Sequence, residues 1–233
     1  MNKINIKSFV RVLMILFILL PPVTPLSCVR AAEIIKIGDI SASTSGLSSV
    51  QAISQLAISD INQYMIENDF PYRFEAAVRD ATGDANYHLE VVQSLKNLGV
   101  NLVIGGRWSS QAQTSIEYMN QNNMLLLSPS STSHLLAIPD DSLFRTCGID
   151  PIERAVLAEM LWSHGIKAIV VIQRGDWWAD GKYEKLKLEF EKRGGVVLTR
   201  VRYSTTATDY SNYLASAEDT LSTAKTTYDT SSL

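Results

Sequence analysis

Residues 100–110 read VNLVIGGRWSS, a short and mostly apolar run that ends in a glycine pair. Val100 to Ile104 is typical of a buried strand, and the serine at position 109 or 110 can begin a helix. The next segment repeats this arrangement, since the apolar run Met124 to Leu127 leads into the hydroxyl-rich loop Ser128 to Ser133. Strands that alternate with helices predict a parallel sheet, because parallel neighbours need a long crossover connection between them.

The same alternation extends to both sides of this segment. Four strands separated by helices predict a sheet covered on both faces, and a second series after residues 144–146 predicts a second sheet. The expected fold class is therefore α/β, with two doubly wound parallel-sheet lobes. The predicted strands are Ile34 to Ile40, Arg73 to Asp80, Val100 to Ile104, Met124 to Leu127, Ile166 to Gln173 and Val196 to Tyr203. The predicted helices run from about Val50 to Glu67, from a cap at Asp84, from Ser109 or Ser110, from about Pro151 to His164, from about Gly181 to Lys192 and from near Asp209.

A break near Thr146 marks the expected domain boundary. Residues 32–146 are predicted to form an N-terminal ligand-binding lobe, and residues 147–233 a partial C-terminal lobe. The last helical pattern, Tyr210 to Leu221, is followed by a Ser/Thr-rich tail and by no strand. A lobe with two strands would close its core poorly. We therefore expect the second lobe to be incomplete and the chain to be part of a longer one.

The N-terminus has the pattern of a secretory signal. Lys3, Lys7 and Arg11 precede an apolar run from Val12 to Leu20, which two prolines end, and small residues follow at positions 31 and 32. The apolar run is short for a membrane span of about 20 residues. Residues 1–31 are therefore predicted to be a cleaved signal peptide, which implies export to the periplasm or outside the cell.

Two alternatives for the N-terminus stay open. The apolar run could remain as a membrane anchor, or Cys28 could receive a lipid after cleavage. The residues before Cys28, Pro25-Leu26-Ser27, are a poor lipobox because proline stands where leucine is expected.

Composition excludes several functions. The 233 residues carry a formal net charge of -3 without a basic stripe, so no nucleic-acid partner is expected. No HExxH, GxSxG, P-loop or GxGxxG motif occurs, and the histidines His88, His134 and His164 are scattered. With Cys28 in the leader, Cys147 has no partner and is expected to be a small buried residue. The sequence predicts a protein that is not an enzyme and has no metal, cofactor or structural disulfide.

Two hydroxyl-rich loops are the candidate ligand site. Both follow strands that we expect to be neighbours, so both open onto the crevice beyond the strand ends, where such sheets bind ligands. The first loop enters a helix whose N-terminus favours an anion. Hydroxyls donate to a carboxylate and accept from an ammonium, so a free amino acid would suit them. Ser109, Ser130 and Thr132 are the candidates, whereas the simpler role of helix cap or turn residue is favoured for the serines at 110, 128 and 133.

An aromatic pair follows the strand Ile166 to Gln173 at the corresponding edge of the second lobe. Trp177 and Trp178 leave a strand in succession, so at most one of them should face the crevice. Such a ring could cover the apolar part of a ligand, or it could be an ordinary half-buried tryptophan.

Taken in order, these segments resemble the type 1 periplasmic solute-binding proteins, in particular the leucine/isoleucine/valine-binding group. The resemblance runs from about Glu33 to Tyr213. The stretches that carry it are Ile35-Lys36-Ile37-Gly38, Ala57-Ile58-Ser59-Asp60-Ile61-Asn62, Val78-Arg79-Asp80-Ala81, Val103-Ile104-Gly105-Gly106 through Ser109-Ser110, Leu127-Ser128-Pro129-Ser130-Ser131-Thr132, Phe144-Arg145-Thr146 and Trp178-Ala179-Asp180-Gly181.

The resemblance implies two lobes joined by a hinge, first crossed at Phe144-Arg145-Thr146, which close over an amino acid for the permease of an ABC transporter. It implies that Ser109 contacts the ligand at the helix start. Ser130, Ser131 and Thr132 would hold the α-carboxylate and α-ammonium, and Trp178 would be the aromatic residue of the second lobe.

Three departures from the family pattern leave the identity of the ligand undetermined at this point. The loop after the first strand is short and lacks the family's aromatic residue, and Thr82 and Trp108 stand where some relatives have a disulfide. The part of the second lobe that usually supplies an acidic partner for the ligand's ammonium is absent. Three alternatives to a transport protein remain, namely the ectodomain of a receptor or sensor, an enzyme, and a nonfunctional gene fragment.

Overall fold

The computed structural model describes residues 31–149 and 151–227, and the side chains of 151, 152, 226 and 227 are not considered. Almost all of the predicted signal peptide, including Cys28, lies outside the described residues, as does the end of the tail.

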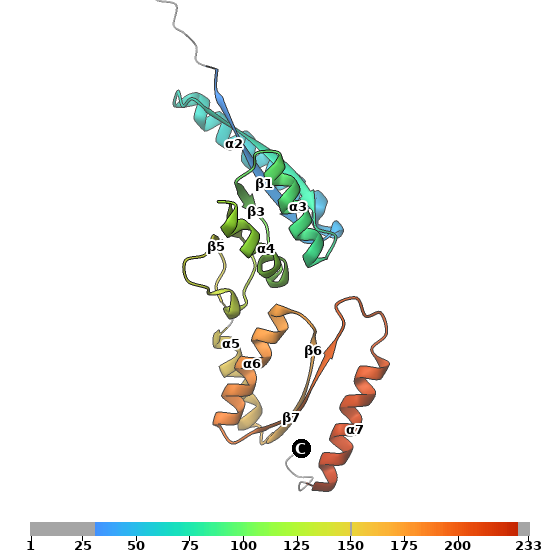
Figure 1. Ribbon diagram of the computed structural model, residues 1–233. Coiled ribbons are helices and arrows are strands. Elements are labelled where there is room, and N and C mark those ends of the chain that lie inside the picture. The colour runs from blue at the N-terminus through green and yellow to red at the C-terminus, as the bar shows by residue number, and fades with distance from the viewer. Residues whose placement is uncertain (1–30, 150, 228–233) are drawn as a thin grey trace, which may run out of the picture. The chain divides into compact units, whose positions relative to one another are not determined.

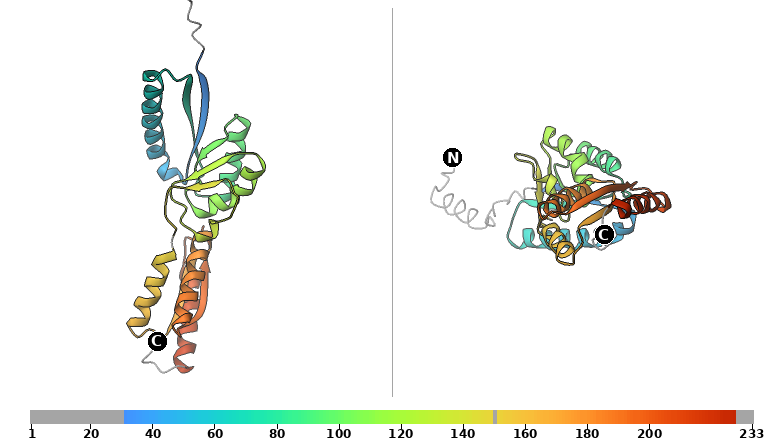
Figure 2. Two further views of the ribbon diagram at one scale, coloured as in Figure 1. Left: turned by 90° about the vertical axis from the view of Figure 1, so that its left-hand side faces the viewer. Right: turned by 90° about the horizontal axis from the view of Figure 1, so that it is seen from below.

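The first sheet has five parallel strands in the order β2-β1-β3-β4-β5 (Figure 1). Helix α2 packs on β1 and β2, whereas α3 and α4 pack together on the opposite side (Figure 2). The sheet is therefore covered on both faces, as the strand-helix alternation predicts. The elements are β1 Glu33–Ser41, α2 Leu47–Glu67, β2 Tyr72–Asp80, α3 Ala85–Asn97, β3 Leu102–Ile104, α4 Ser109–Gln121, β4 Leu125–Ser128 and β5 Leu143–Arg145.

The prediction of four strands in this sheet is wrong by one. Leu143–Arg145 pairs with β4 through Leu126 and Ser128, in a segment that the sequence marks only as a crossing between lobes. The strand has three residues, and its Phe144 is 56% exposed. The strand is too short to show a period, and the connection before it holds the single 3-10 turn His134–Leu136 instead of an α-helix. A sequence pattern therefore has nothing to detect there.

The core of the first sheet lies between β1, β3, β4 and the helices α3 and α4. Ile40, Leu95, Val103 and Leu126 are completely buried there. Gly38 allows the close approach of α3, because a Cβ at this position would lie 2.8 Å from Leu95 Cδ1. This packing fixes the ends of β3 and β4, from which the candidate loops leave.

Helix α2 packs differently from its apolar pattern. The pattern puts Ile53 and Leu56 on its apolar face, yet these are 67% and 64% exposed, whereas Val50 and Ser54 are buried. Further along, the side-chain amide of Asn62 donates to Phe74 O at 2.9 Å and accepts from Phe74 N at 2.8 Å. The helix thus satisfies backbone groups of the edge strand β2.

The second sheet has two parallel strands, β6 Ala168–Arg174 and β7 Val196–Tyr203, with an irregularity between Ile169 and Val170. Helices α5 Pro151–Ser163 and α6 Trp177–Lys192 pack around Phe190, and α7 Ser211–Thr227 packs on the strands from the other side (Figure 1). The prediction that α6 begins at Gly181 is wrong. Asp176 caps the helix by accepting from Ala179 N at 2.9 Å, so Trp178 lies in the first helical turn.

Candidate functional site

The two hydroxyl-rich loops meet above β3 and β4, as the sequence predicts. Ser128 Oγ donates to Gly106 O at 2.9 Å, and Ser130 Oγ donates to Arg107 O at 2.8 Å. Ser133 N donates to Ser109 Oγ at 3.3 Å. These bonds join the loop after β4 to the loop after β3 and to the start of α4, so the two loops form one continuous wall.

Four of the five predicted site residues lie in this wall, and their environments differ. Ser131 is completely buried, with its hydroxyl on Gly106 O and its N–H on Ser128 Oγ, so it holds the loop in place. Ser130 is exposed. Ser109 is 2% exposed, and its Oγ accepts from Ser133 while its own proton has no acceptor in the described part of the chain.

Buried His88 supports the turn that leads into α4. Gly106 N donates to His88 Nε2 at 2.9 Å, so Nδ1 carries the proton and donates to Ser115 Oγ at 2.7 Å. Burial lowers the pKa of His88 to about 4. Gly106 has a φ of 53°, and a Cβ there would lie 2.9 Å from Ala112 Cβ. A neutral histidine and a glycine together shape the turn.

Arg107 is a site residue that sequence reasoning missed. Its Nη2 donates to Asp39 Oδ1 at 2.8 Å and its Nε donates to Ile40 O at 3.1 Å. Asp39 is 6% exposed, and its other oxygen accepts from Ser54 Oγ at 2.6 Å. The guanidinium is therefore fixed from behind by the end of β1. The position of Asp39 at the crevice edge is the one signal in the sequence that could have indicated such a partner.

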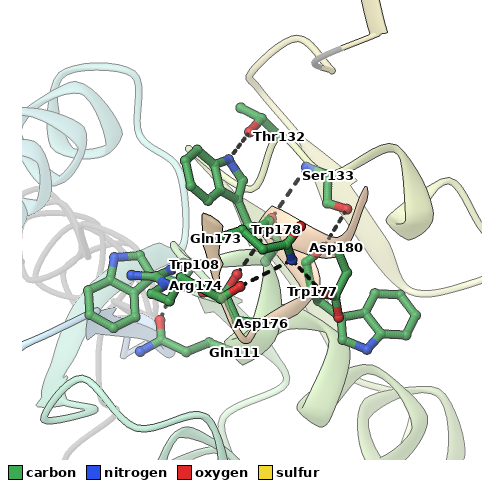
Figure 3. Close-up of polar contacts among 12 residues, drawn as sticks. Trp108, Gln111, Thr132, Ser133, Gln173, Arg174, Asp176, Trp177, Trp178 and Asp180 are labelled. Carbon is green, nitrogen blue, oxygen red and sulfur yellow. Dashed lines mark hydrogen bonds and ion pairs between the residues drawn. The ribbon is translucent and has the colours of Figure 1, made fainter. Parts of the chain in front are cut away.

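The second wall comes from the end of β6 and the start of α6. Trp178 Nε1 donates to Thr132 Oγ1 at 3.1 Å, and Ser133 Oγ donates to Trp177 O at 3.3 Å (Figure 3). Trp177 packs against the core of the first sheet, whereas Trp178 is 38% exposed. These contacts join the second wall directly to the loop after β4.

Arg174 lies between the two walls and forms an ion pair with Asp176 (Figure 3). Its guanidinium carbon is 5.3 Å from the ring centre of Trp108 and 5.9 Å from that of Trp178. One indole comes from each wall, and both distances are within the range of a cation–π interaction.

Two cavities meet at Trp108 and Arg174. The smaller measures about 230 Å³ and is lined by Arg107, Trp108, Ser109, Ser130, Arg174 and Trp178. The larger measures about 740 Å³, and its lining includes the carboxylates of Asp84, Asp176 and Asp180. Ser109, Ser130 and Trp178 of the predicted set thus line the smaller cavity, whereas Thr132 bonds the indole that covers it.

Comparison with known proteins connects this geometry to a family. The model of the periplasmic binding protein family matches residues 35–227. The chain belongs to this family. An uncharacterized protein of Methanocaldococcus jannaschii is 27% identical over 190 residues, which cover 77% of this chain and 45% of that protein.

Solved structures of periplasmic binding proteins share the fold. A periplasmic binding protein of Burkholderia mallei is 17% identical with a TM-score of 0.64, over 80% of this chain and 51% of that one. A leucine-binding protein, LivK, of Thermotoga maritima is 20% identical with a TM-score of 0.61, over 80% and 54%. This chain therefore spans about half the length of the relatives that it matches.

Asp180 organises the second wall of this periplasmic binding protein. Its carboxylate accepts from Gln173 Nε2 at 2.9 Å, from Arg202 Nε and Nη2 at 3.0 and 2.8 Å, and from Arg200. The cluster ties the first turn of α6 to both strands of the second sheet.

Other functional groups are few in the described part of the chain. No group of three or more potential metal ligands occurs there, and none of its helices has the length and apolarity to cross a membrane. Cys147 is a free thiol and is partly exposed, which corrects the prediction of a buried residue. It lies just beyond the end of β5, where its Sγ contacts Ser131 O at 3.5 Å.

Proposed function

We propose that this periplasmic binding protein is an extracytoplasmic solute-binding protein, which captures an amino acid or a related small polar solute and delivers it to the permease of an ABC transporter. The observation that supports it most is the cavity between the two walls, where hydroxyls, guanidinium groups and indoles converge. The Thermotoga maritima relative is a leucine-binding protein, which agrees with this solute class.

Each predicted residue has a role in this proposal. Ser109 donates its free proton to the carboxylate of the solute, and Ser130 offers hydroxyl lone pairs at the cavity rim. Ser131 holds the loop, Thr132 orients Trp178, and the indole of Trp178 covers the apolar part of the solute. Residues 32–146 form the first lobe, residues 147–233 belong to the second, and residues 1–31 are removed during export.

Binding without chemical change fits the residues of the site. The aspartates of the larger cavity are engaged with arginines, backbone N–H groups or a side-chain amide, and His88 is buried under a glycine turn. Closure of the two walls would remove water from the cavity and strengthen its polar contacts. The solute would then leave unaltered, as transport requires.

A thermal-shift screen of the full chain against free amino acids and small carboxylates tests the proposal. A solute at about 100 times its Kd stabilises the folded state by about 2.7 kcal/mol, which is a shift of several degrees. The double variant Ser109→Ala, Thr132→Ala should weaken binding by about 2 kcal/mol or more. Absence of any stabilising solute, or unchanged binding by the double variant, would contradict the proposed function or the proposed site, respectively.

A further inference from the structure

The charges around the smaller cavity indicate which class of solute it binds, an inference that rests on the proposed function. We propose that the solute is an aromatic carboxylate, an anion with a planar apolar body, rather than a zwitterionic aliphatic amino acid. Its carboxylate lies against Arg107 and Arg174, and its ring lies against Trp108 and Trp178.

Arg107 is prepared to bind an anion. Asp39 and the carbonyl of Ile40 hold its Nη2 and Nε, while its Nη1 makes no hydrogen bond in the described part of the chain. A guanidinium has five N–H donors, so Nη1 remains available to a ligand that enters the cavity. Because the group is already held in one orientation, a carboxylate meets it with little loss of side-chain entropy.

Arg174 and the two indoles supply the rest of the site. Trp108 and Trp178 are 37% and 38% exposed, and each comes from a different wall. Indoles give a large and rigid apolar surface, which a planar ring can contact at low conformational cost. The guanidinium of Arg174 already lies near both indole rings. When the ring of a ligand packs against these indoles, the guanidinium is close enough to pair with the ligand's carboxylate.

Among the described residues, the ammonium of an amino acid has no carboxylate partner in this cavity. No acidic residue of residues 31–149 and 151–227 lines it, and two guanidinium groups do. The aspartates of the larger cavity are engaged elsewhere, since Asp84 caps α3, Asp176 binds Arg174 and the backbone N–H of residue 179, and Asp180 accepts from three side chains. Asp39 and Asp176 already balance the charges of the two arginines, so no described carboxylate beside the cavity is left for an ammonium, whereas a carboxylate can still accept from Arg107 Nη1.

Calorimetric titration of the full chain with four probes tests the inference. Benzoate supplies the ring and the charge, benzamide keeps the shape without the charge, L-phenylalanine adds an ammonium, and L-leucine is the aliphatic amino acid. We expect benzoate to bind at least tenfold more tightly than each of the other three. Tenfold corresponds to about 1.4 kcal/mol.

Variants assign the effect to the two arginines. Arg107→Gln and Arg174→Gln should each weaken benzoate binding at least tenfold. Arg73→Gln is the matched control, because Arg73 lies near the opposite end of β2 and, within the described residues, donates to the carbonyls of Phe70 and Tyr72 alone. If Arg107→Gln fails to fold because Asp39 loses its charged partner, Arg107→Lys is the second variant, which keeps the charge but loses the fork geometry. It should weaken benzoate binding several-fold.

Each outcome separates this inference from the proposed function. Tighter binding of leucine or phenylalanine than of benzoate would overturn the inference and leave the proposed function in place. Equal binding of benzoate and benzamide, or no binding of benzoate, would also overturn the inference. If in addition no solute of the wider screen stabilised the chain, the proposed function would be wrong as well.

Discussion

His88 should make the stability of the fold depend on pH. Its folded-state pKa is lowered to about 4 by burial, whereas an unfolded histidine titrates near 6.5. The folded state therefore binds fewer protons than the unfolded state in this interval, and stability falls as the pH falls from about 6.5 towards 4. The contribution of His88 should be a loss of about 1 kcal/mol at pH 5.5 and about 2 to 3 kcal/mol at pH 4.5.

Urea unfolding at pH 7, 5.5 and 4.5 measures this loss, and His88→Gln isolates it. A glutamine offers an uncharged acceptor to Gly106 N and does not titrate, so the variant should lose less stability on acidification than the wild type by the amounts above. His164→Gln is the control, because His164 is exposed, and it should follow the wild type. Parallel pH profiles of the wild type and His88→Gln would refute the reasoning.

Three further changes test other parts of the structure. Gly106→Ala should lower the free energy of unfolding by about 3 kcal/mol in urea, because the backbone there has a positive φ and the added Cβ would clash with Ala112. Gly99 also has a positive φ but open space around it, so Gly99→Ala should cost about 1 kcal/mol. Asp180→Asn should lower the free energy of unfolding by about 2 kcal/mol since it loses three charge-assisted donors, and Asp219→Asn on the exposed side of α7 should leave it unchanged. Trp178→Phe removes the indole N–H that bonds Thr132 and should weaken solute binding by about 1 kcal/mol in calorimetric titration. Unchanged affinity would contradict the role of this bond in joining the two walls.

The regular elements of the fold could be predicted because hydrophobic periodicity is a local property. The strand ending at Ile104 and the helix beginning at Ser109 follow from eleven consecutive residues. The short strand β5 could not be predicted, because its pairing with β4 depends on tertiary contact. The predicted start of α6 lies too late in the chain because the helical pattern omits the cap Asp176, although Asp is among the residues most favoured at that position.

The candidate site was only partly predictable for the same reason. The two loops were found from their composition, since Ser and Thr after strands are a local signal. The roles of the arginines were not, because Arg107 becomes a directed donor only through Asp39, which lies 68 residues away. No spacing rule relates them, and Arg174 likewise needs the two indoles to define its position.

The two indoles beside Arg174 also make the molecule its own optical sensor. The chain contains four tryptophans, and two of them, Trp108 and Trp178, line the smaller cavity. A solute that displaces water there changes the surroundings of half of the intrinsic fluorophores at once. Emission wavelength and intensity therefore report occupancy directly, without a dye, a label or an engineered reporter.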